Sequence, residues 1–256
     1  MIKLRFLGTG DGRECKVKRR LTKEFRRPAS VLINDNILVD PSAEALSFIE
    51  EFGLSGLYSR LTDIVFTSLN PKSYSEEILK TLTKSGAVNI HIPTGFKTNL
   101  DFYDASLIAE TDKFEVFELG GAKAFFLPAS TERHEDGGRD LSFALFSDRA
   151  LLYAPQGGWF DPDAWAVIRR LKFDAVVLDA AMADADMSEG YVYHNGLATL
   201  KPMRDILLSS SVISERTKVI LTSLPTDKKR PIHAEISPMA QELSMTVAYD
   251  GYFLGI

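Results

Sequence analysis

The sequence predicts an α/β fold, a four-layered αββα sandwich in which two mixed β-sheets lie between outer layers of helices. Short apolar or alternating runs, typical of strands, recur through both halves of the 256 residues, and longer stretches of helical periodicity separate them. No linker rich in Pro, Gly or Ser and no low-complexity tract divides the halves. We therefore expect residues 1–256 to form one domain, with a basic insertion at about residues 13–28.

The first half contains strands, one hairpin and two helices. The hairpin turns at Asn34–Asn36, residue types that tolerate positive φ. Ser42 can cap a helix over Ala43–Phe52, which Gly53 would end, and a second helix covers Tyr74–Lys84. Expected strands are Lys3–Leu7, Ala29–Ile33, Ile37–Val39, Asp63–Thr67, Val88–Ile92, Phe114–Leu119 and Lys123–Leu127.

The second half repeats this alternation. Helices are expected at Asp161–Leu171, at Leu197–Leu208 and around Glu235–Leu243, the last entered at Pro238. Asp250-Gly251 predicts a closing hairpin. The expected strands, the two arms of that hairpin included, are Leu141–Phe146, Ala150–Tyr153, Ala175–Leu178, Lys218–Thr222, Thr246–Tyr249 and Tyr252–Leu254.

Charge and cysteine content exclude several classes of protein. With 30 Lys and Arg against 35 Asp and Glu, the net charge of −5 argues against a generally basic nucleic-acid binder. A single cysteine excludes an internal disulfide and a cysteine-based zinc cluster. The N-terminus carries charges within its apolar stretch, and no window approaches the roughly 18 uninterrupted apolar residues of a spanning helix. We expect a cytoplasmic protein without membrane contact.

Histidine is scarce. The four histidines are His91, His134, His194 and His233, and no two lie within five residues of each other. The local metal signatures H-x-H and H-E-x-x-H are absent. A zinc site built from imidazoles would need nearly all four.

Several segments, taken in chain order, resemble one known superfamily. They are Phe6–Gly10, Arg26–Ile33 with Ile37–Asp40, Leu152–Ala154, Val177–Asp179 with His194-Asn195, Ile220–Thr222 and Ala248–Gly251. Together they resemble the metallo-β-lactamase superfamily, in particular the branch of phosphoribosyl cyclic-phosphate phosphodiesterase and tRNase Z-like hydrolases. The resemblance implies a metallo-β-lactamase-like sandwich, metal-dependent phosphodiester hydrolysis, and dimers as a common state of assembly.

The metal motif departs from that pattern. Family members carry T-H-x-H-x-D-H where this chain has Thr67-Ser68-Leu69-Asn70-Pro71-Lys72-Ser73. Serine and amide side chains are poor zinc ligands, and a lysine ammonium repels a dication. We therefore expect no dinuclear site and no cofactor, the alternative being a single divalent ion such as zinc or manganese. At the ligand positions stand Ser68, Asn70, Lys72, Ser73, Gln156 for the bridging aspartate and Ser223 for the last histidine, with His134 loosely matching the middle histidine.

His194 and Asp179 are the candidate catalytic residues. The resemblance implies that His194 lies beside the substrate phosphate, where an imidazole can donate a proton to a leaving oxygen. The alternative is a histidine that hydrogen-bonds backbone near a helix start. Asp179, at a strand end, either orients that histidine or caps a loop.

A basic stretch precedes the first hairpin. Residues 16–27 hold seven basic residues and one acidic residue, Glu24, whereas the rest of the chain has a net charge of −11. Such a stretch either steers an anionic ligand or is a solvated loop. Because only Phe25 is aromatic there, a nucleic-acid surface is not favoured. The residues expected to steer anions are Lys16, Lys18, Arg19, Arg20, Arg26 and Arg27.

Three functional hypotheses follow. In the first, the protein has lost the dinuclear metal site and is a noncatalytic or strongly diverged relative that binds an anionic, phosphorylated small molecule or a partner. Two readings of Lys72, Ser68, Asn70 and Ser73 then remain: they bind the anion together, or they changed without a new function after the metal was lost. In the second, it is an active metal-dependent phosphodiesterase-like hydrolase with a rebuilt site. In the third, the basic stretch binds nucleic acid. The rebuilt site would use His134 and His194 with carboxylates such as Asp40, Asp136 or Asp179.

Overall fold

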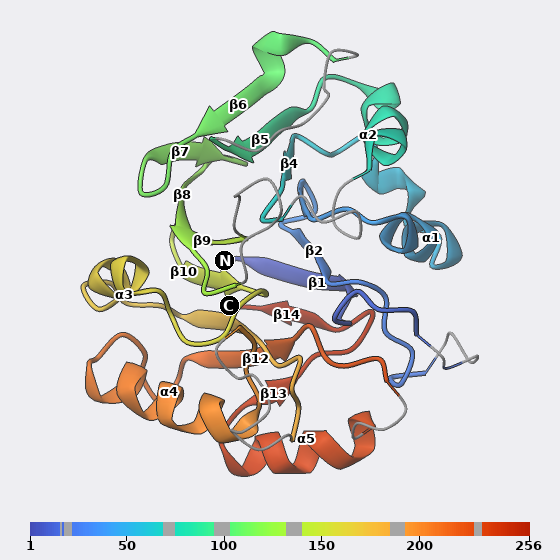
Figure 1. Ribbon diagram of the computed structural model, residues 1–256. Coiled ribbons are helices and arrows are strands. Elements are labelled where there is room, and N and C mark those ends of the chain that lie inside the picture. The colour runs from blue at the N-terminus through green and yellow to red at the C-terminus, as the bar shows by residue number, and fades with distance from the viewer. Residues whose placement is uncertain are drawn as a thin grey trace.

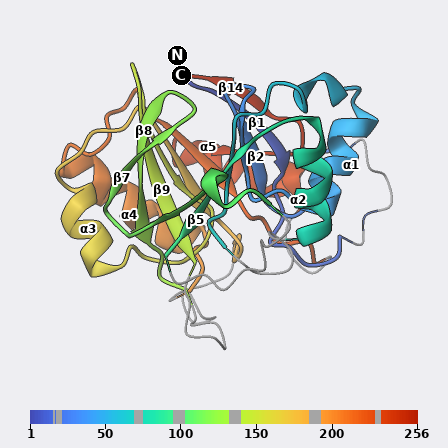
Figure 2. The same ribbon diagram turned by 90° about the horizontal axis from the view of Figure 1, so that it is seen from above.

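Two sheets lie face to face in the middle of the protein (Figures 1 and 2). The computed structural model describes residues 1–15, 17, 22–68, 75–94, 103–131, 140–184, 193–227 and 232–256. Within these ranges each sheet has seven strands. The architecture expected from the sequence, two mixed sheets in an α/β sandwich, is confirmed.

The first sheet is antiparallel at one side and parallel at the other. Neighbours from β14 to β3 are antiparallel, and those from β3 to β6 are parallel. Its spatial order is β14 (Phe253–Gly255), β1 (Lys3–Gly8), β2 (Ser30–Ile33), β3 (Ile37–Val39), β4 (Asp63–Val65), β5 (Asn89–Pro93) and β6 (Ile108–Thr111).

The second sheet has the same mixture. Neighbours from β13 to β10 are parallel, and those from β10 to β7 are antiparallel. Its spatial order is β13 (Thr246–Val247), β12 (Lys218–Thr222), β11 (Ala175–Asp179), β10 (Ala150–Ala154), β9 (Leu141–Phe146), β8 (Ala122–Pro128) and β7 (Val116–Leu119).

Helices cover the outer face of each sheet. Figure 2 shows α1 and α2 on the side of the first sheet, and α3 and α4 on the side of the second. Short 3-10 helices η1 (Ser55–Leu57), η2 (Thr83–Ser85) and η3 (Ala105–Leu107) lie between elements of the first half. The α-helices are α1 (Ala43–Glu51), α2 (Glu76–Leu82), α3 (Pro162–Ile168), α4 (Leu197–Ser209) and α5 (His233–Glu242).

Three apolar cores hold the four layers together. Phe48 of α1 and Leu79 of α2 pack against the outer face of the first sheet, and a second core joins α3, α4 and α5 to the second sheet. The third core lies between the sheets and includes Phe6, Phe126 and Tyr153. Because each strand alternates between an inner and an outer apolar face, both faces of each sheet are buried.

Local signals placed most elements correctly. Ser42 Oγ accepts a hydrogen bond from the backbone N–H of Ala45 at 3.0 Å and so caps α1, and Gly53 ends the helix with φ +64°. Asn34 and Asp35 have φ of 53° and 62° in the β2–β3 turn, as expected from their tolerance of positive φ. The alternating pattern did not indicate β6, which is a short strand at the edge of its sheet.

Two expectations for the C-terminal part were wrong. The helix α5 does not begin at Pro238: it begins at His233, where the Glu235 side chain accepts a hydrogen bond from the N–H of Ile232 at 3.0 Å. No hairpin forms between β13 and β14, because β13 pairs with β12 in the second sheet and β14 pairs with β1 in the first. The turn at Asp250-Gly251 instead carries the chain from one sheet to the other.

No helix in the described ranges combines the length and the apolar character needed to cross a bilayer.

Candidate functional site

The candidate site lies where parallel strands of both sheets end. In α/β sheets, ligands bind outside the carboxyl ends of parallel strands. Here Asp40 follows β3, Thr67 follows β4, Asp179 ends β11 and Ser223 follows β12. A hydrogen bond of 2.8 Å from the N–H of Leu141 to the carbonyl of Thr67 joins the two sheets at this end. We call this region the carboxyl edge.

Asp179 contacts His194 across the second sheet's carboxyl edge. Oδ2 of Asp179 lies 3.1 Å from Nδ1 of His194, while Oδ1 accepts hydrogen bonds from the backbone N–H groups of Asn195 at 2.9 Å and Ala181 at 3.1 Å. Asp179 is 1% exposed, whereas the His194 side chain is 41% exposed. The carboxylate therefore both orients the imidazole and caps the loop, leaving the outer part of the ring accessible.

The pKa values of both groups are raised, each for a different reason. The hydrogen bond that His194 donates to Asp179 raises the pKa of His194 above its usual value, against an opposing effect of burial. Burial raises the pKa of Asp179, and His194 and the two backbone N–H groups oppose that rise. The carboxylate of Asp179 therefore favours the charged form of the partly exposed imidazole.

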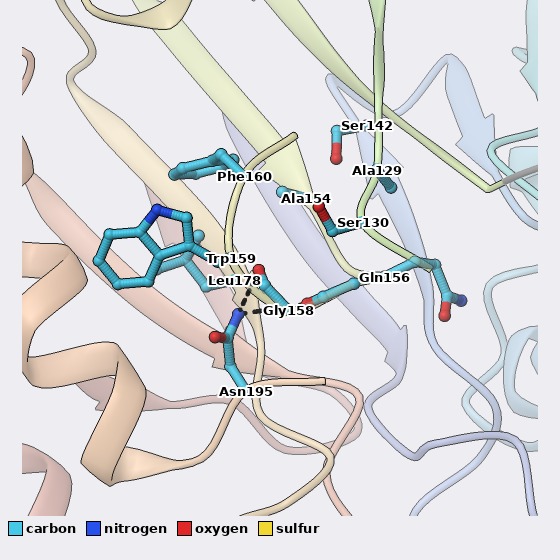
Figure 3. A pocket seen from close by; sticks show the side chains of 11 residues that line it. Ala129, Ser130, Ser142, Ala154, Gln156, Gly158, Trp159, Phe160, Leu178 and Asn195 are labelled. Carbon is cyan, nitrogen blue, oxygen red and sulfur yellow. Dashed lines mark hydrogen bonds between the residues drawn. The ribbon is translucent and has the colours of Figure 1, made fainter. Parts of the chain in front are cut away.

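Asn195 ties this pair to the loop after β10. Its side-chain amide donates to the carbonyls of Gly157 at 3.2 Å and Gly158 at 2.9 Å, and its oxygen accepts from the Thr199 hydroxyl at 3.1 Å. Figure 3 shows Asn195 reaching these carbonyls. Asn195 had no predicted role of its own. An asparagine followed four residues later by threonine at a helix start is the signal that could have indicated it.

Gln156, at the position of the family's bridging aspartate, lies in this same loop. A cavity of about 10 Å³, room for about one water molecule, is lined by Gln156, Ser142, Trp159 and other residues of the loop and neighbouring strands. Figure 3 shows the Gln156 side chain at the opposite end of the loop from Trp159, pointing away from Asn195. Its half-buried amide is a neutral donor and acceptor rather than an anionic ligand.

Ser223, at the position of the family's last histidine, is engaged inside the protein. It is 2% exposed, and its hydroxyl donates to the carbonyl of Pro155 at 2.5 Å. Its φ of +56° is unusual for a residue other than glycine. The hydroxyl therefore joins the ends of β10 and β12, and its hydrogen is already used inside the protein.

Asp40 holds the end of β4. Its carboxylate accepts the N–H of Thr67 at 2.8 Å and the Thr67 hydroxyl at 2.5 Å, and the residue is 1% exposed with φ +47°. Ser68, the next residue, is buried as well. Burial raises the pKa of Asp40 to about 7, against the opposing effect of the Thr67 hydrogen bonds and with a smaller contribution from Asp140. Asp40 thus positions Thr67 and Ser68, where the sequence resemblance places the start of the metal motif.

Two of the described positions at which the sequence resemblance places metal ligands carry neutral side chains. These are the amide of Gln156 and the hydroxyl of Ser223, which donates to a carbonyl, and both groups are poor zinc ligands compared with imidazole or carboxylate. Among the described residues, no three or more His, Cys, Asp or Glu side chains are grouped to hold a metal ion. The sequence candidates that lie outside the described residues are Asn70, Lys72, Ser73, His134, Asp136, Lys16, Lys18, Arg19 and Arg20.

The two described arginines of the basic stretch are buried. Arg27 is 1% exposed, and its guanidinium pairs with Asp250 at 3.1 Å and Glu51 at 2.7 Å. Arg26 is 4% exposed, and its Nη1 donates to the carbonyl of Pro225 at 2.5 Å. These positions do not suit the steering of ligands at the surface, because a buried guanidinium projects little of its field into solvent.

The remaining histidines lie apart from this pair. His91 Nε2 lies 2.7 Å from Oδ1 of Asp63, near the amino ends of β4 and β5, and both residues are buried. The ring of His91 stacks on Phe117 of the second sheet with centroids 5.1 Å apart. His233 begins α5 and is 7% exposed. In the described part of the chain, neither His91 nor His233 hydrogen-bonds to His194.

No protein-family model matches the chain, and no curated protein matches it in sequence. Solved structures do: the fold is that of the metallo-β-lactamases. The metallo-β-lactamase-fold protein YhfI from Bacillus subtilis is 13% identical with a TM-score of 0.70, the match covering 99% of this chain and 98% of that one.

Two further structures match over the full length. Zinc-bound PqqB from Methylobacterium extorquens is 14% identical with a TM-score of 0.71, covering 99% of this chain and 100% of that chain. The short form of human tRNase Z is 14% identical with a TM-score of 0.67, covering 99% of each chain. Identities this low establish the likeness of the fold, and the resemblance in fold expected from the ordered sequence segments is confirmed.

Proposed function

We propose that this metallo-β-lactamase-fold protein binds an anionic, phosphorylated ligand at the carboxyl edge and has lost the dinuclear metal centre of the fold. The observation that carries the proposal is the His194–Asp179 pair, in which a buried carboxylate holds a partly exposed imidazole at 3.1 Å. An imidazolium so held offers a charge and an N–H donor to a phosphate oxygen.

The replaced ligand positions support binding without the metal. Gln156 and Ser223 supply neutral groups where the resembling family supplies an anion and an imidazole. In the sequence, Lys72 adds an ammonium close to Ser68 and Asn70, and these residue types suit an oxyanion better than a dication. The chemistry of the edge is therefore that of an anion site.

The test is a titration with inorganic phosphate and with phenyl phosphate, followed by NMR at the Cε1–H of His194 and by calorimetry. We expect a saturable shift of that resonance and an affinity loss of about tenfold in His194→Ala, the usual scale for one charge-assisted hydrogen bond. Lys201→Ala, an exposed lysine of α4, is the matched control and should leave affinity unchanged. An unshifted His194 resonance at saturating ligand would refute the proposed site.

The metal part of the proposal has its own test. Protein purified without chelators should contain far less than one equivalent of zinc, manganese or iron. Near-stoichiometric metal that competes with phosphate would overturn this part and leave the His194 titration to be judged separately.

A rebuilt hydrolase is the second candidate, because the Asp179–His194 pair also has the geometry of an oriented general acid. In this reading His194 protonates the leaving oxygen of a phosphodiester, with one divalent ion such as zinc or manganese supplying Lewis-acid chemistry. The candidate predicts turnover of bis(p-nitrophenyl) phosphate that His194→Ala abolishes. Absence of turnover with each of several divalent metals would eliminate it.

A cytoplasmic location and a homodimer belong to the same proposal. The single cysteine supports the first, because it fits a reducing compartment, and the resemblance in sequence segments supports the second. Cell fractionation and light scattering on the purified protein test them.

A further inference from the structure

Arg26 is a buried cation whose hydrogen-bonding capacity is only partly used. Nη1 donates to the carbonyl of Pro225 at 2.5 Å, but Nε and Nη2 are fully buried and have no hydrogen-bond partner among the described residues. A charged donor that is buried without an acceptor destabilises a protein by about 1–3 kcal/mol or more. Such groups are rare in folded proteins. The adjacent Arg27 shows the contrast, since Asp250 and Glu51 satisfy its guanidinium.

His233 lies beside Arg26 and has the same deficit. It is 7% exposed, its ring Nδ1 is buried, and no described group hydrogen-bonds to that atom. Burial lowers the pKa of His233, and the nearby charges of Lys23 and Arg26 lower it further. Lys23 also reaches this region, with Nζ 4.4 Å from the ring centroid of Tyr249, which meets His233 edge to face. Three nitrogen-bearing side chains from two distant parts of the chain thus gather in one place.

The acidic side chains nearby are already engaged. Glu24 accepts the backbone N–H of His233 at 2.7 Å, and Asp250 accepts from Arg27. Asp11 accepts the Thr226 hydroxyl at 3.0 Å. These carboxylates raise the pKa of Arg26 against the larger lowering by burial, but none of them hydrogen-bonds to its Nε–Nη2 edge.

We propose that Arg26 and His233 form a subsite for an oxyanion group, phosphate or carboxylate, separate from His194. The Nε and Nη2 hydrogens of a guanidinium point in parallel and match two oxygens of one such group. His233 Nδ1 supplies a further hydrogen bond in its N–H tautomer, and Lys23 supplies charge. The anion would accept hydrogen bonds from the donors that no described group of the protein pairs with.

The subsite adjoins the carboxyl edge. Asp11 acts electrostatically on both Arg26 and His194, so the turn after β1 lies near both side chains. In the sequence, basic residues precede Arg26 at 16–20 and precede His233 at 228–230. A buried Arg26 does not suit the steering of anions at the surface, but it suits direct hydrogen bonding to one bound anion.

The experiment uses the whole protein and the Nε–H resonance of Arg26 in a 15N spectrum, assigned through the chain and by its loss in Arg26→Lys. Inorganic phosphate is titrated at pH 7, with acetate as a second arm that separates a phosphate site from a general carboxylate site. We expect a saturable shift with phosphate in the millimolar range, about 1 mM being typical for one small anion. Binding by acetate alone would assign the subsite to carboxylates.

Variants and a control complete the test. Arg26→Lys keeps the charge but removes the paired donors, and should weaken phosphate binding at this subsite about tenfold, while His233→Phe should weaken it to a smaller extent. Arg149→Lys, at the opposite end of the second sheet, should change nothing. An Arg26 Nε–H that stays unshifted in wild-type protein would overturn the proposal and assign the acceptor to water. Because His194 Cε1–H reports its own site, failure of one proposal is distinguishable from failure of the other.

Discussion

Arg27 and Asp250 form an almost fully buried ion pair, with Nη1 of the arginine 3.1 Å from Oδ2 of the aspartate and exposures of 1% and 3%. The same oxygen accepts the backbone N–H of Arg27 at 2.9 Å, and Asp250 Oδ1 accepts the Thr9 hydroxyl at 2.9 Å. Three segments that are far apart in sequence therefore meet at one carboxylate: the turn after β1, the entry to β2 and the crossing between β13 and β14.

Removing this arginine should destabilise the protein strongly. Arg27→Met leaves the buried carboxylate of Asp250 without its cation, which typically costs about 3–5 kcal/mol of unfolding free energy. Urea unfolding should be measured at pH 8, because burial raises the pKa of Asp250 to about 6 and the group must be ionised. Arg149→Met removes an ion pair whose side chains are 53% and 36% exposed, and should cost at most about 1 kcal/mol. Equal losses in the two variants would contradict this account.

Asp40 should make stability fall as the pH rises toward neutrality. Its pKa in the folded protein is raised by burial to about 7 from an ordinary value of 3.8, so the folded state holds a proton that the unfolded state has released. The contribution is fully present below about pH 4 and is lost as the pH rises through about 7; over the whole shift it amounts to about 4 kcal/mol.

The variant Asp40→Asn isolates this effect, because an amide resembles the protonated acid at every pH. Between pH 4 and pH 8, the stability of the variant relative to wild type should increase, as followed by urea unfolding at each pH. Curves that run parallel across this range would show that Asp40 has an ordinary pKa in the folded protein.

Asp179→Asn should lower the pKa of His194. The hydrogen bond to the Asp179 carboxylate is the main cause of the raised pKa, and its loss leaves burial, which disfavours the charged imidazole. The Cε1–H resonance of His194 should therefore titrate at lower pH in the variant. The resonance of His233 serves as an internal reference in the same sample, since Asp179 has no part in its shift. An unchanged midpoint for His194 would rule out the pairing in solution.

Gly8→Ala should disrupt the end of β1. A Cβ there would lie 1.9 Å from the carbonyl oxygen of Pro28 and 2.9 Å from that of Arg27, so backbone would have to move. We expect a loss of more than about 3 kcal/mol in thermal or urea unfolding. Gly56→Ala meets nothing within 4 Å and should change stability by less than about 1 kcal/mol. A mild effect at Gly8 would mean that the close approach of these two strands can relax.

The predicted caps, helix ends and turns were correct where the local structure depends only on neighbouring residues. Ser42 caps α1, Gly53 ends it and Asn34–Asn36 turns the first hairpin, because capping and positive φ depend on a few neighbouring residues. The same approach missed β6 and misplaced the start of α5, where the side chain of Glu235 outweighed the presence of Pro238 within the helix.

Partnerships between distant segments were beyond the reach of the sequence. Thr246–Tyr249 and Tyr252–Leu254 have the pattern of a hairpin, yet their strands join different sheets, since each finds a longer partner at a sheet edge. Neighbouring Arg26 and Arg27 are chemically alike, but only one of them meets two carboxylates.

The sequence by itself determined the layered α/β architecture, because the apolar periodicity of each segment depends only on the residues of that segment. Only the tertiary structure decided that Asp179 holds His194, that the hydroxyl of Ser223 is committed to Pro155, and that Arg26 is buried with unmet donors. These contacts depend on which strand ends lie close together, and the packing of the three cores between distant segments determines that.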